Sequence, residues 1–248
     1  MKLKLITFLL LFSGFISAQE IKHFKNGQLN LAGELFKPNG KGPFPTILYN
    51  HGSAPGMLSS EASKTIAPLF LQKGWAFFMP YRRGQGLSAK AGKYIGDEPD
   101  IVRALKTDHF SDQMAGLTWL KKQKFINQNK IAVMGNSFGG IQTILATSQN
   151  KFCAGVDAAG GSESWAKSKE LQDIMKEAVA KSQTPLFFFQ AENDFDLSPS
   201  KILSGIKGEM KIYPAFGKTA KDGHSFTYRG SSIWFEDVFS FILKNCGQ

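Results

Sequence analysis

The chain has 248 residues and a formal net charge of +10 at pH 7. Its length suits one domain with a large hydrophobic core. The lysines are scattered along the chain, and no zinc-finger spacing or other nucleic-acid motif is present, so no nucleic-acid partner is expected.

The N-terminus has the pattern of a secretory signal peptide. Two lysines precede an apolar run that ends near Phe12, and small residues follow at Ser17 and Ala18. The run is shorter than the roughly 20 residues of a membrane-spanning helix, so no stable membrane insertion is expected. We therefore expect residues 1–18 to be removed, residues 19–248 to form one domain, and the protein to be periplasmic or secreted.

Segments with strand character alternate along the rest of the chain with segments of helical character. The first expected strand alternates polar and apolar residues, and the later ones are mostly continuous apolar runs, as in strands covered on both faces. The expected strands are 29–38, 44–52, 74–84, 130–137, 153–161, 185–194 and 209–217. The expected helices are 59–74, 111–124, 138–149, 168–181 and 231–245.

This alternation predicts an α/β fold with a mostly parallel central sheet of about seven to eight strands, helices on both faces and no large cap domain. Pro68 lies inside the first expected helix and predicts a kink or a late start there. Ser111 is expected to cap the second helix. Long loops are expected over 89–110 and 161–170, at the carboxyl ends of strands, where such folds place their sites.

The segment IAVMGNSFGG, residues 131–140, holds the candidate nucleophile. Ser137 lies between an apolar strand and a helix in a Gly-x-Ser-x-Gly pattern, which is typical of a nucleophile elbow. The turn is so sharp that only small residues fit at Gly135 and Gly139. The serine hydroxyl would then stand at a helix N-terminus, where backbone N–H groups favour developing negative charge. A glycine-rich turn with an inert serine is the alternative.

A serine nucleophile needs a base, and the chain has four histidines. His224 follows the last strand in a polar, glycine-containing loop and is the expected base. His51 follows an early strand and is expected to tie its loop down. His109 is expected to be an ordinary loop residue, and His23 a surface residue that precedes the sheet.

The base in turn needs a carboxylate that fixes its tautomer. Asp194, at the tip of the turn after an apolar strand, is the expected acid, and Asp196 and Asp157 are the alternatives. Nucleophile, acid and base then follow in the chain order that the elbow pattern requires.

The oxyanion of a tetrahedral intermediate needs hydrogen-bond donors. The expected pair is the backbone N–H of Phe138, next to the nucleophile, and that of Ser53, in the loop HGSAPG. An ordinary turn at this loop is the alternative. Arg82 and Arg83 follow a strand, and we expect one of them to brace loops through backbone carbonyls and the other to be exposed.

Together the segments YNHGSAPG, MPYRRGQGLS, IAVMGNSFGG, QAENDFD and DGHSF resemble the α/β-hydrolase superfamily. Within it the chain is similar to secreted dienelactone-hydrolase-like serine esterases, and more distantly to prolyl-oligopeptidase-type catalytic domains. The resemblance implies a triad of Ser137, Asp194 and His224, with Ser53 and Phe138 as oxyanion donors. True dienelactone hydrolases have a cysteine where this chain has a serine, so their lactone activity is not expected.

These patterns predict a serine hydrolase that cleaves carboxylic esters of small molecules through an acyl-enzyme and needs no metal or cofactor. A prolyl-oligopeptidase-like peptidase or amidase with the same mechanism is the alternative. A non-catalytic binding protein on the same fold is a third hypothesis.

The two long loops give hypotheses about the substrate. Tyr94 and Trp165 lie in them and are candidates to line a pocket. Lys90, Lys93 and Arg103 lie in the first loop and suggest acidic esters as substrates.

Cys153 and Cys246 are the two cysteines of the chain. An exported domain permits a disulfide, but sequence does not place the two sulfur atoms within bonding distance. A disulfide and free thiols both stay open, and the oligomeric state is not predicted.

Overall fold

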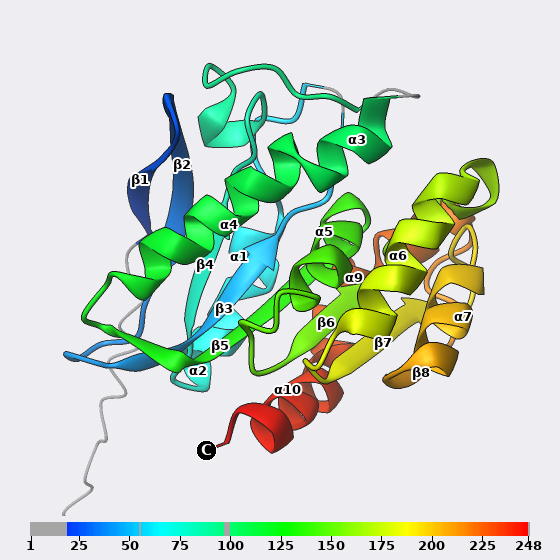
Figure 1. Ribbon diagram of the computed structural model, residues 1–248. Coiled ribbons are helices and arrows are strands. Elements are labelled where there is room, and N and C mark those ends of the chain that lie inside the picture. Colours follow the sequence, from blue (N-terminus) through cyan, green and yellow to red (C-terminus); the bar gives the residue numbers. More distant parts are fainter. Residues whose placement is uncertain (1–18, 55, 97–99, 248) are drawn as a thin grey trace, which may run out of the picture.

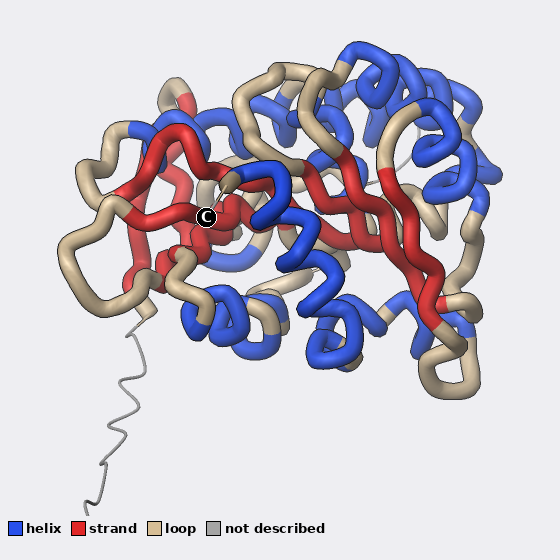
Figure 2. Tube along the Cα trace, turned by 90° about the horizontal axis from the view of Figure 1, so that it is seen from below, coloured by secondary structure: helices blue, strands red, loops and turns tan. Residues whose placement is uncertain are grey.

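The structure is a computed structural model, and it describes residues 19–54, 56–96 and 100–247. The expected signal peptide, residues 1–18, lies outside the described residues. A single eight-stranded sheet runs through the molecule in the order β1-β2-β4-β3-β5-β6-β7-β8. Helices lie on both of its faces (Figures 1 and 2). The predicted mostly parallel α/β architecture is confirmed.

The strands pair in parallel from β4 to β8, while β1 pairs antiparallel with β2, and β2 with β4. Their bounds are β1 (Glu20–Asn26), β2 (Leu29–Phe36), β3 (Phe44–Asn50), β4 (Ala76–Pro80), β5 (Ile126–Asn136), β6 (Gly155–Ala158), β7 (Leu186–Ala191) and β8 (Glu209–Tyr213). Parallel pairing brings the carboxyl ends of β3, β5, β6 and β7 to one edge, which is where sites form in such sheets.

The helices divide between the two faces of the sheet. Helices α1, α2 and α10 pack on one face, and α4, α5 and α6 cover the other. The bounds are α1 (Ala62–Thr65), α2 (Ala67–Gln72), α3 (Asp100–Lys106), α4 (Asp108–Lys121), α5 (Phe138–Thr147), α6 (Lys169–Lys181), α7 (Ser198–Ile206), α8 (Ala220–His224), α9 (Phe226–Arg229) and α10 (Ser231–Cys246). Within the described residues, no helix combines the length and the apolar character that crossing a bilayer requires.

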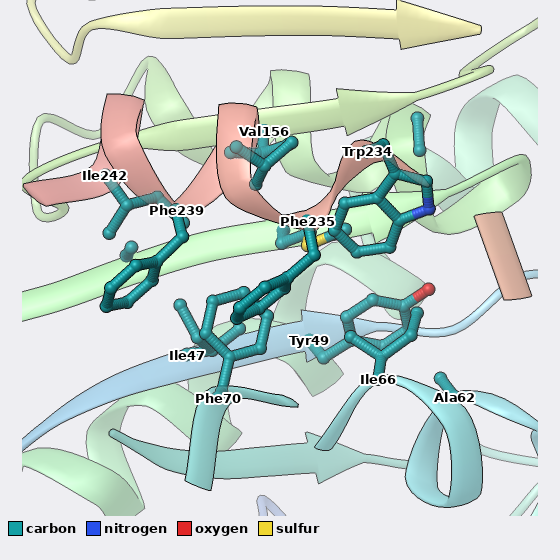
Figure 3. Close-up of a cluster of buried hydrophobic side chains, with 14 of the residues drawn as sticks. Ile47, Tyr49, Ala62, Ile66, Phe70, Val156, Trp234, Phe235, Phe239 and Ile242 are labelled. Atoms are coloured by element: carbon teal, nitrogen blue, oxygen red, sulfur yellow. The ribbon is translucent and has the colours of Figure 1, made fainter. Parts of the chain in front are cut away.

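An aromatic core holds α10 against the sheet. Figure 3 shows side chains of α10, α2 and β3 meeting between the layers. The Phe70 and Phe235 rings meet edge-on with centroids 5.1 Å apart, and Trp234 lies 5.0 Å from Phe189. Each such buried ring contributes about 1.5–3 kcal/mol. This packing fixes the layer that carries the last helices of the chain.

The first strand, β1, was not predicted because its side chains are mostly polar. Only Phe24 is buried in it. Asn26 and Gly27 begin the tight turn to β2, and Gly27 has a φ of 57°, as this hairpin turn requires. The expectation that His23 precedes the sheet is therefore wrong, although His23 is exposed as expected.

Residues 89–110 do not form the uninterrupted loop that was predicted. The segment contains α3, which buries Val102 and Leu105, and the start of α4 at Asp108. Ser111 is therefore inside α4 and does not cap it; its hydroxyl donates to the Asp108 carbonyl at 2.9 Å.

Helices α7 and α8 were not predicted, whereas α2 lies within a predicted helix. In α7, Pro199 lies in the first turn, where proline is tolerated. His224 is the last residue of α8, capped by Thr219 and Asp222, rather than a loop residue. The first expected helix is divided into α1 and α2, and Pro68 lies in the first turn of α2. The interruption predicted there as a kink or a late start is therefore confirmed as a break between two helices.

Cys153 and Cys246 form a disulfide across 93 residues of sequence. The bond joins the segment before β6 to the last residue of α10. It resolves the choice between a disulfide and free thiols, and it ties the C-terminal helix to the centre of the sheet.

Candidate active site

Ser137 lies in the turn between β5 and α5 with a positive φ of 54°. Such an angle is strained for a non-glycine residue and persists only where the surroundings hold it. The Ser137 N–H donates to the Ala158 carbonyl at 2.9 Å. A Cβ at Gly139 would lie 1.9 Å from the Asn50 carbonyl oxygen, and one at Gly135 would lie 2.3 Å from the Gly139 oxygen. The sharp turn and its need for glycine are as the sequence predicts.

His224 connects the serine to a carboxylate. Its Nε2 lies 3.0 Å from the Ser137 Oγ, and its Nδ1 lies 2.9 Å from Oδ1 of Asp194. Asp196 instead accepts the Ser198 N–H at 2.8 Å, at the start of α7. The structure thus brings together the three side chains selected from the sequence.

The environment sets the charges of this triad. Burial lowers the pKa of His224, but the hydrogen bond and charge of Asp194 and the charge of Glu163 outweigh it, so the pKa lies above the ordinary 6.5. Burial raises the pKa of Asp194, but hydrogen bonds from its neighbours, above all His224, hold it below the ordinary 3.8. Asp194 is therefore ionised at neutral pH, and His224 becomes a free base only above its raised pKa.

Ser162 is a site residue that the sequence reasoning missed. Its hydroxyl donates to Asp194 Oδ1 at 2.7 Å and lies 3.2 Å from His224 Nδ1. The Gln190 side chain donates to the other Asp194 oxygen at 3.1 Å, and the Phe195 N–H donates to Oδ1 at 2.7 Å. These bonds satisfy the buried carboxylate and fix its direction.

The two predicted oxyanion donors lie beside the nucleophile. Phe138 is the first residue of α5, Ser53 lies in the loop after β3, and both line a cavity together with Ser137. In the described part of the chain neither N–H donates to another protein group. Both are therefore free to bind a substrate oxygen.

The Asn136 side chain, also missed from the sequence, fastens the loop after β3 to the elbow. Its Oδ1 accepts the Gly52 N–H at 3.1 Å and the Tyr49 hydroxyl at 2.9 Å. Its amide nitrogen donates to the Tyr228 hydroxyl. The residue before the nucleophile thus positions the loop that carries Ser53.

Arg82, which lies just after β4, braces the same loop, as one of the two arginines was predicted to do. It donates to the His51 carbonyl at 2.8 Å and to the Gly52 carbonyl at 2.7 Å. Its guanidinium lies 4.6 Å from the centre of the Phe138 ring. Burial lowers the pKa of Arg82 to about 10, so it remains charged at neutral pH.

Arg83 is not the exposed residue that was predicted. Its guanidinium forms ion pairs with Asp108 and Asp112, each at 2.8 Å, and its side chain is only 17% exposed. Both carboxylates belong to α4, whose first turn was expected to be part of a loop.

The other buried histidines do not compete as bases. His51 Nδ1 lies 2.7 Å from the Gly52 carbonyl, its ring packs on Tyr81, and burial lowers its pKa well below 6.5. It ties its loop down as expected. His109 lies on α4, contacts the Ile95 backbone, and has a pKa lowered by burial to about 4. Its assignment to a loop is wrong.

Two cavities meet at Ser137. One, of about 120 Å³, lies beside Tyr94 and Phe138. The other, of about 330 Å³, lies beside His224 and Tyr228. A substrate bound across Ser137 can place its acyl part on one side and its leaving group on the other. Among the described residues, no group of three or more His, Cys, Asp or Glu side chains is placed to hold a metal ion.

The residues that line these cavities can be compared with the loop residues that were expected to contact the substrate. Tyr94 lines the smaller cavity, whereas Trp165 is buried in the core. None of Lys90, Lys93 and Arg103 is among the described residues that line either cavity. The structure therefore gives no support to basic residues that select acidic esters.

Asp157, an alternative for the acid, is fully buried in β6 against the first turn of α5. Its Oδ1 accepts the Gly160 N–H at 2.9 Å, and its Oδ2 has no hydrogen-bond partner among the described residues. Burial raises the pKa of Asp157 to about 7, against the effect of the Gly160 bond and with help from the charge of Asp194.

Replacing Asp157 with asparagine is expected to remove a pH-dependent loss of stability. The folded protein retains a proton that the unfolded chain releases near the ordinary pKa of 3.8. As the pH rises from there towards the folded-state pKa, the free energy of unfolding falls by about 1.4 kcal/mol per pH unit, and it falls no further above that pKa. Urea unfolding at several pH values between about 4 and 7 should show that the free energy of unfolding of the variant, relative to that of the wild type, increases by about 1.4 kcal/mol per pH unit. A constant difference would contradict the prediction.

Comparison with known proteins shows which families and folds this chain is similar to. The family model described as the prolyl oligopeptidase family matches residues 63–177, which include the elbow and end before Asp194 and His224. Acylaminoacyl peptidase from Pyrococcus horikoshii is 18% identical with a TM-score of 0.68, and the match covers 92% of this chain and 41% of the peptidase. The chain has an α/β-hydrolase fold.

Two esterases have the same fold. Est1E from Butyrivibrio proteoclasticus, solved with bound ferulic acid, is 15% identical with a TM-score of 0.70, and the match covers 92% of this chain and all of Est1E. A Pyrococcus furiosus esterase is 16% identical with a TM-score of 0.68, and the match covers 93% of this chain and 92% of the esterase. By contrast, the chain spans only about two fifths of the length of the Pyrococcus horikoshii acylaminoacyl peptidase.

Proposed function

We propose that the protein is a serine hydrolase that cleaves carboxylic ester bonds through an acyl-enzyme, with Ser137, Asp194 and His224 as its triad. The observation that carries the proposal is the position of His224. One ring nitrogen lies 3.0 Å from the serine oxygen and the other lies 2.9 Å from an ionised, buried carboxylate. This is the arrangement that activates a serine towards a carbonyl carbon.

The steps follow from these contacts. Ser137 Oγ attacks the ester carbonyl while His224 Nε2 takes its proton, and Asp194 stabilises the imidazolium. The N–H groups of Ser53 and Phe138 bind the oxyanion. His224 then gives the proton to the departing alcohol, which leaves the acyl group on Ser137. Water attacks this acyl-enzyme while His224 takes its proton, and return of that proton to Ser137 Oγ releases the acid.

Ester cleavage suits the divided site. The smaller cavity, of about 120 Å³, favours a short acyl group or a small ring, and the larger cavity leaves room for the alcohol. The match to the prolyl oligopeptidase family model favours a second candidate, which is cleavage of peptide or amide bonds by the same steps.

The N-terminal sequence supports action outside the cytoplasm, in the periplasm or beyond. The disulfide between Cys153 and Cys246 fits an oxidising compartment. A relation to dienelactone-hydrolase-like esterases, with serine in place of cysteine, is part of the same proposal.

Treatment with a fluorophosphonate should add one label to the folded protein, mapped to Ser137 by peptide mass spectrometry. The Ser137→Ala and His224→Ala variants should remain unlabelled, because the first lacks the nucleophile and the second lacks its base. Short-chain esters and aminoacyl amides then distinguish the two bonds. An unlabelled wild type that is folded by circular dichroism would favour the non-catalytic binding protein instead.

A further inference from the structure

Glu163 lies where the two cavities meet, although no step of the proposed mechanism uses it. It lines both cavities, as Ser137 does. Its Oε2 is 3.7 Å from His224 Nε2, the atom that faces the nucleophile. The carboxylate is therefore within a few ångströms of the bond to be broken.

The turn after β6 holds Glu163 in this place. Ala159 and Gly161 both have positive φ angles, and the Ser164 and Trp165 N–H groups donate to the Gly161 carbonyl. The preceding residue, Ser162, is bonded to Asp194. Glu163 thus projects from a turn fastened to the triad, so its position relative to the nucleophile is set by the fold.

No lysine or arginine among the described residues forms an ion pair with Glu163. Glu61, which lines the larger cavity, is paired with Lys64. Lys221 lines the larger cavity only. The negative charge of Glu163 therefore faces both halves of the site, and its side chain is 53% exposed, so a bound substrate can reach it.

We propose that Glu163 is a specificity-determining residue that favours substrates with a cationic group a few atoms from the scissile bond and disfavours anionic ones. The inference rests on the proposed ester hydrolysis and names its substrate class. A substrate ammonium beside this carboxylate gains Coulomb attraction, which solvent and salt reduce because the site is half open. A substrate carboxylate at the same place is repelled.

Two sets of matched esters test this. The first varies the acyl group and uses β-alanine ethyl ester, ethyl butanoate and the monoethyl ester of malonic acid. These are cationic, neutral and anionic at similar size. The second varies the alcohol as the choline and 3,3-dimethylbutyl esters of butanoic acid. The kcat/KM values are measured at low salt for the wild type and the Glu163→Gln variant. Glu170→Gln, which removes an exposed carboxylate that lines neither cavity, is the matched control.

In at least one set, Glu163→Gln should lower the cationic-to-neutral ratio of kcat/KM about fivefold, as expected for one exposed charge pair screened by solvent. In the acyl set it should also raise the anionic-to-neutral ratio. Added salt should shrink the wild-type preference, and Glu170→Gln should keep it.

Unchanged ratios in both sets, or an equal fall for every ester, would overturn the inference, because either result removes charge selection. Fluorophosphonate labelling of Ser137 in the same Glu163→Gln preparation separates this outcome from failure of the proposed function. Labelling with unchanged ratios rejects only the role of Glu163. If the wild type neither reacts with the reagent nor cleaves any ester, the proposed hydrolysis fails and the inference fails with it.

Discussion

Replacing Asp194 with asparagine is expected to lower kcat for ester hydrolysis by about 10⁴-fold. Asp194 accepts the His224 Nδ1–H, which leaves Nε2 unprotonated and able to take the serine proton. An asparagine amide at this place can donate to Nδ1 and favours the tautomer with hydrogen on Nε2. That tautomer cannot accept the serine proton, although the geometry is nearly unchanged.

The matched control is Asp196→Asn. Asp196 accepts the Ser198 N–H at 2.8 Å, and the amide oxygen of an asparagine can accept the same N–H. This variant should keep kcat within about threefold of the wild type, since Asp196 acts only on the local backbone. Steady-state kinetics on one ester, with circular dichroism to verify folding, decides the matter. A comparable loss in both variants would show that the turn after β7, rather than the Asp194 carboxylate, is what catalysis needs.

The fold was predictable where hydrophobic patterning is strong. The buried strands from β3 to β7 are nearly continuous apolar runs, and a parallel sheet covered on both faces follows from them. Patterning fails where an element buries few residues. β1 buries only Phe24, and α3 is a short helix in a polar segment. Their stability comes from pairing with β2 and from packing, which a local pattern does not reveal.

The site was predictable where chain order and local context restrict the choice. Ser137 follows from the strand, the glycines and the helix around it, and His224 and Asp194 follow from their places after successive strands. Ser162 and Glu163 lie in a polar turn without a recognisable motif. The contact of Ser162 with Asp194 arises only when β6 and β7 pair, and that of Glu163 with His224 only when α8 packs near the same strands. Polar residues just after a strand at the site edge were the available signal.

The disulfide is a further contact of this kind, because nothing local marks Cys153 and Cys246 as neighbours. Removing it with the Cys153→Ala/Cys246→Ala variant is expected to lower the free energy of unfolding by about 4.6 kcal/mol, from the loop-closure entropy of a chain segment of this length. The bond closes 93 residues and anchors α10, whose aromatic side chains fill the core of one face (Figure 3). Without it the unfolded chain gains freedom, while the folded contacts of α10 stay in place.

Urea unfolding of the wild type, with and without a reductant, and of the variant measures this difference. The reduced wild type should unfold at nearly the urea concentration of the variant, and the oxidised wild type at a clearly higher one. Alkylation should add mass only after reduction, which verifies the bond itself. Equal unfolding midpoints for the oxidised wild type and the variant would contradict the prediction. Because α10 is held by its own packing as well, the variant should still hydrolyse esters in the absence of urea.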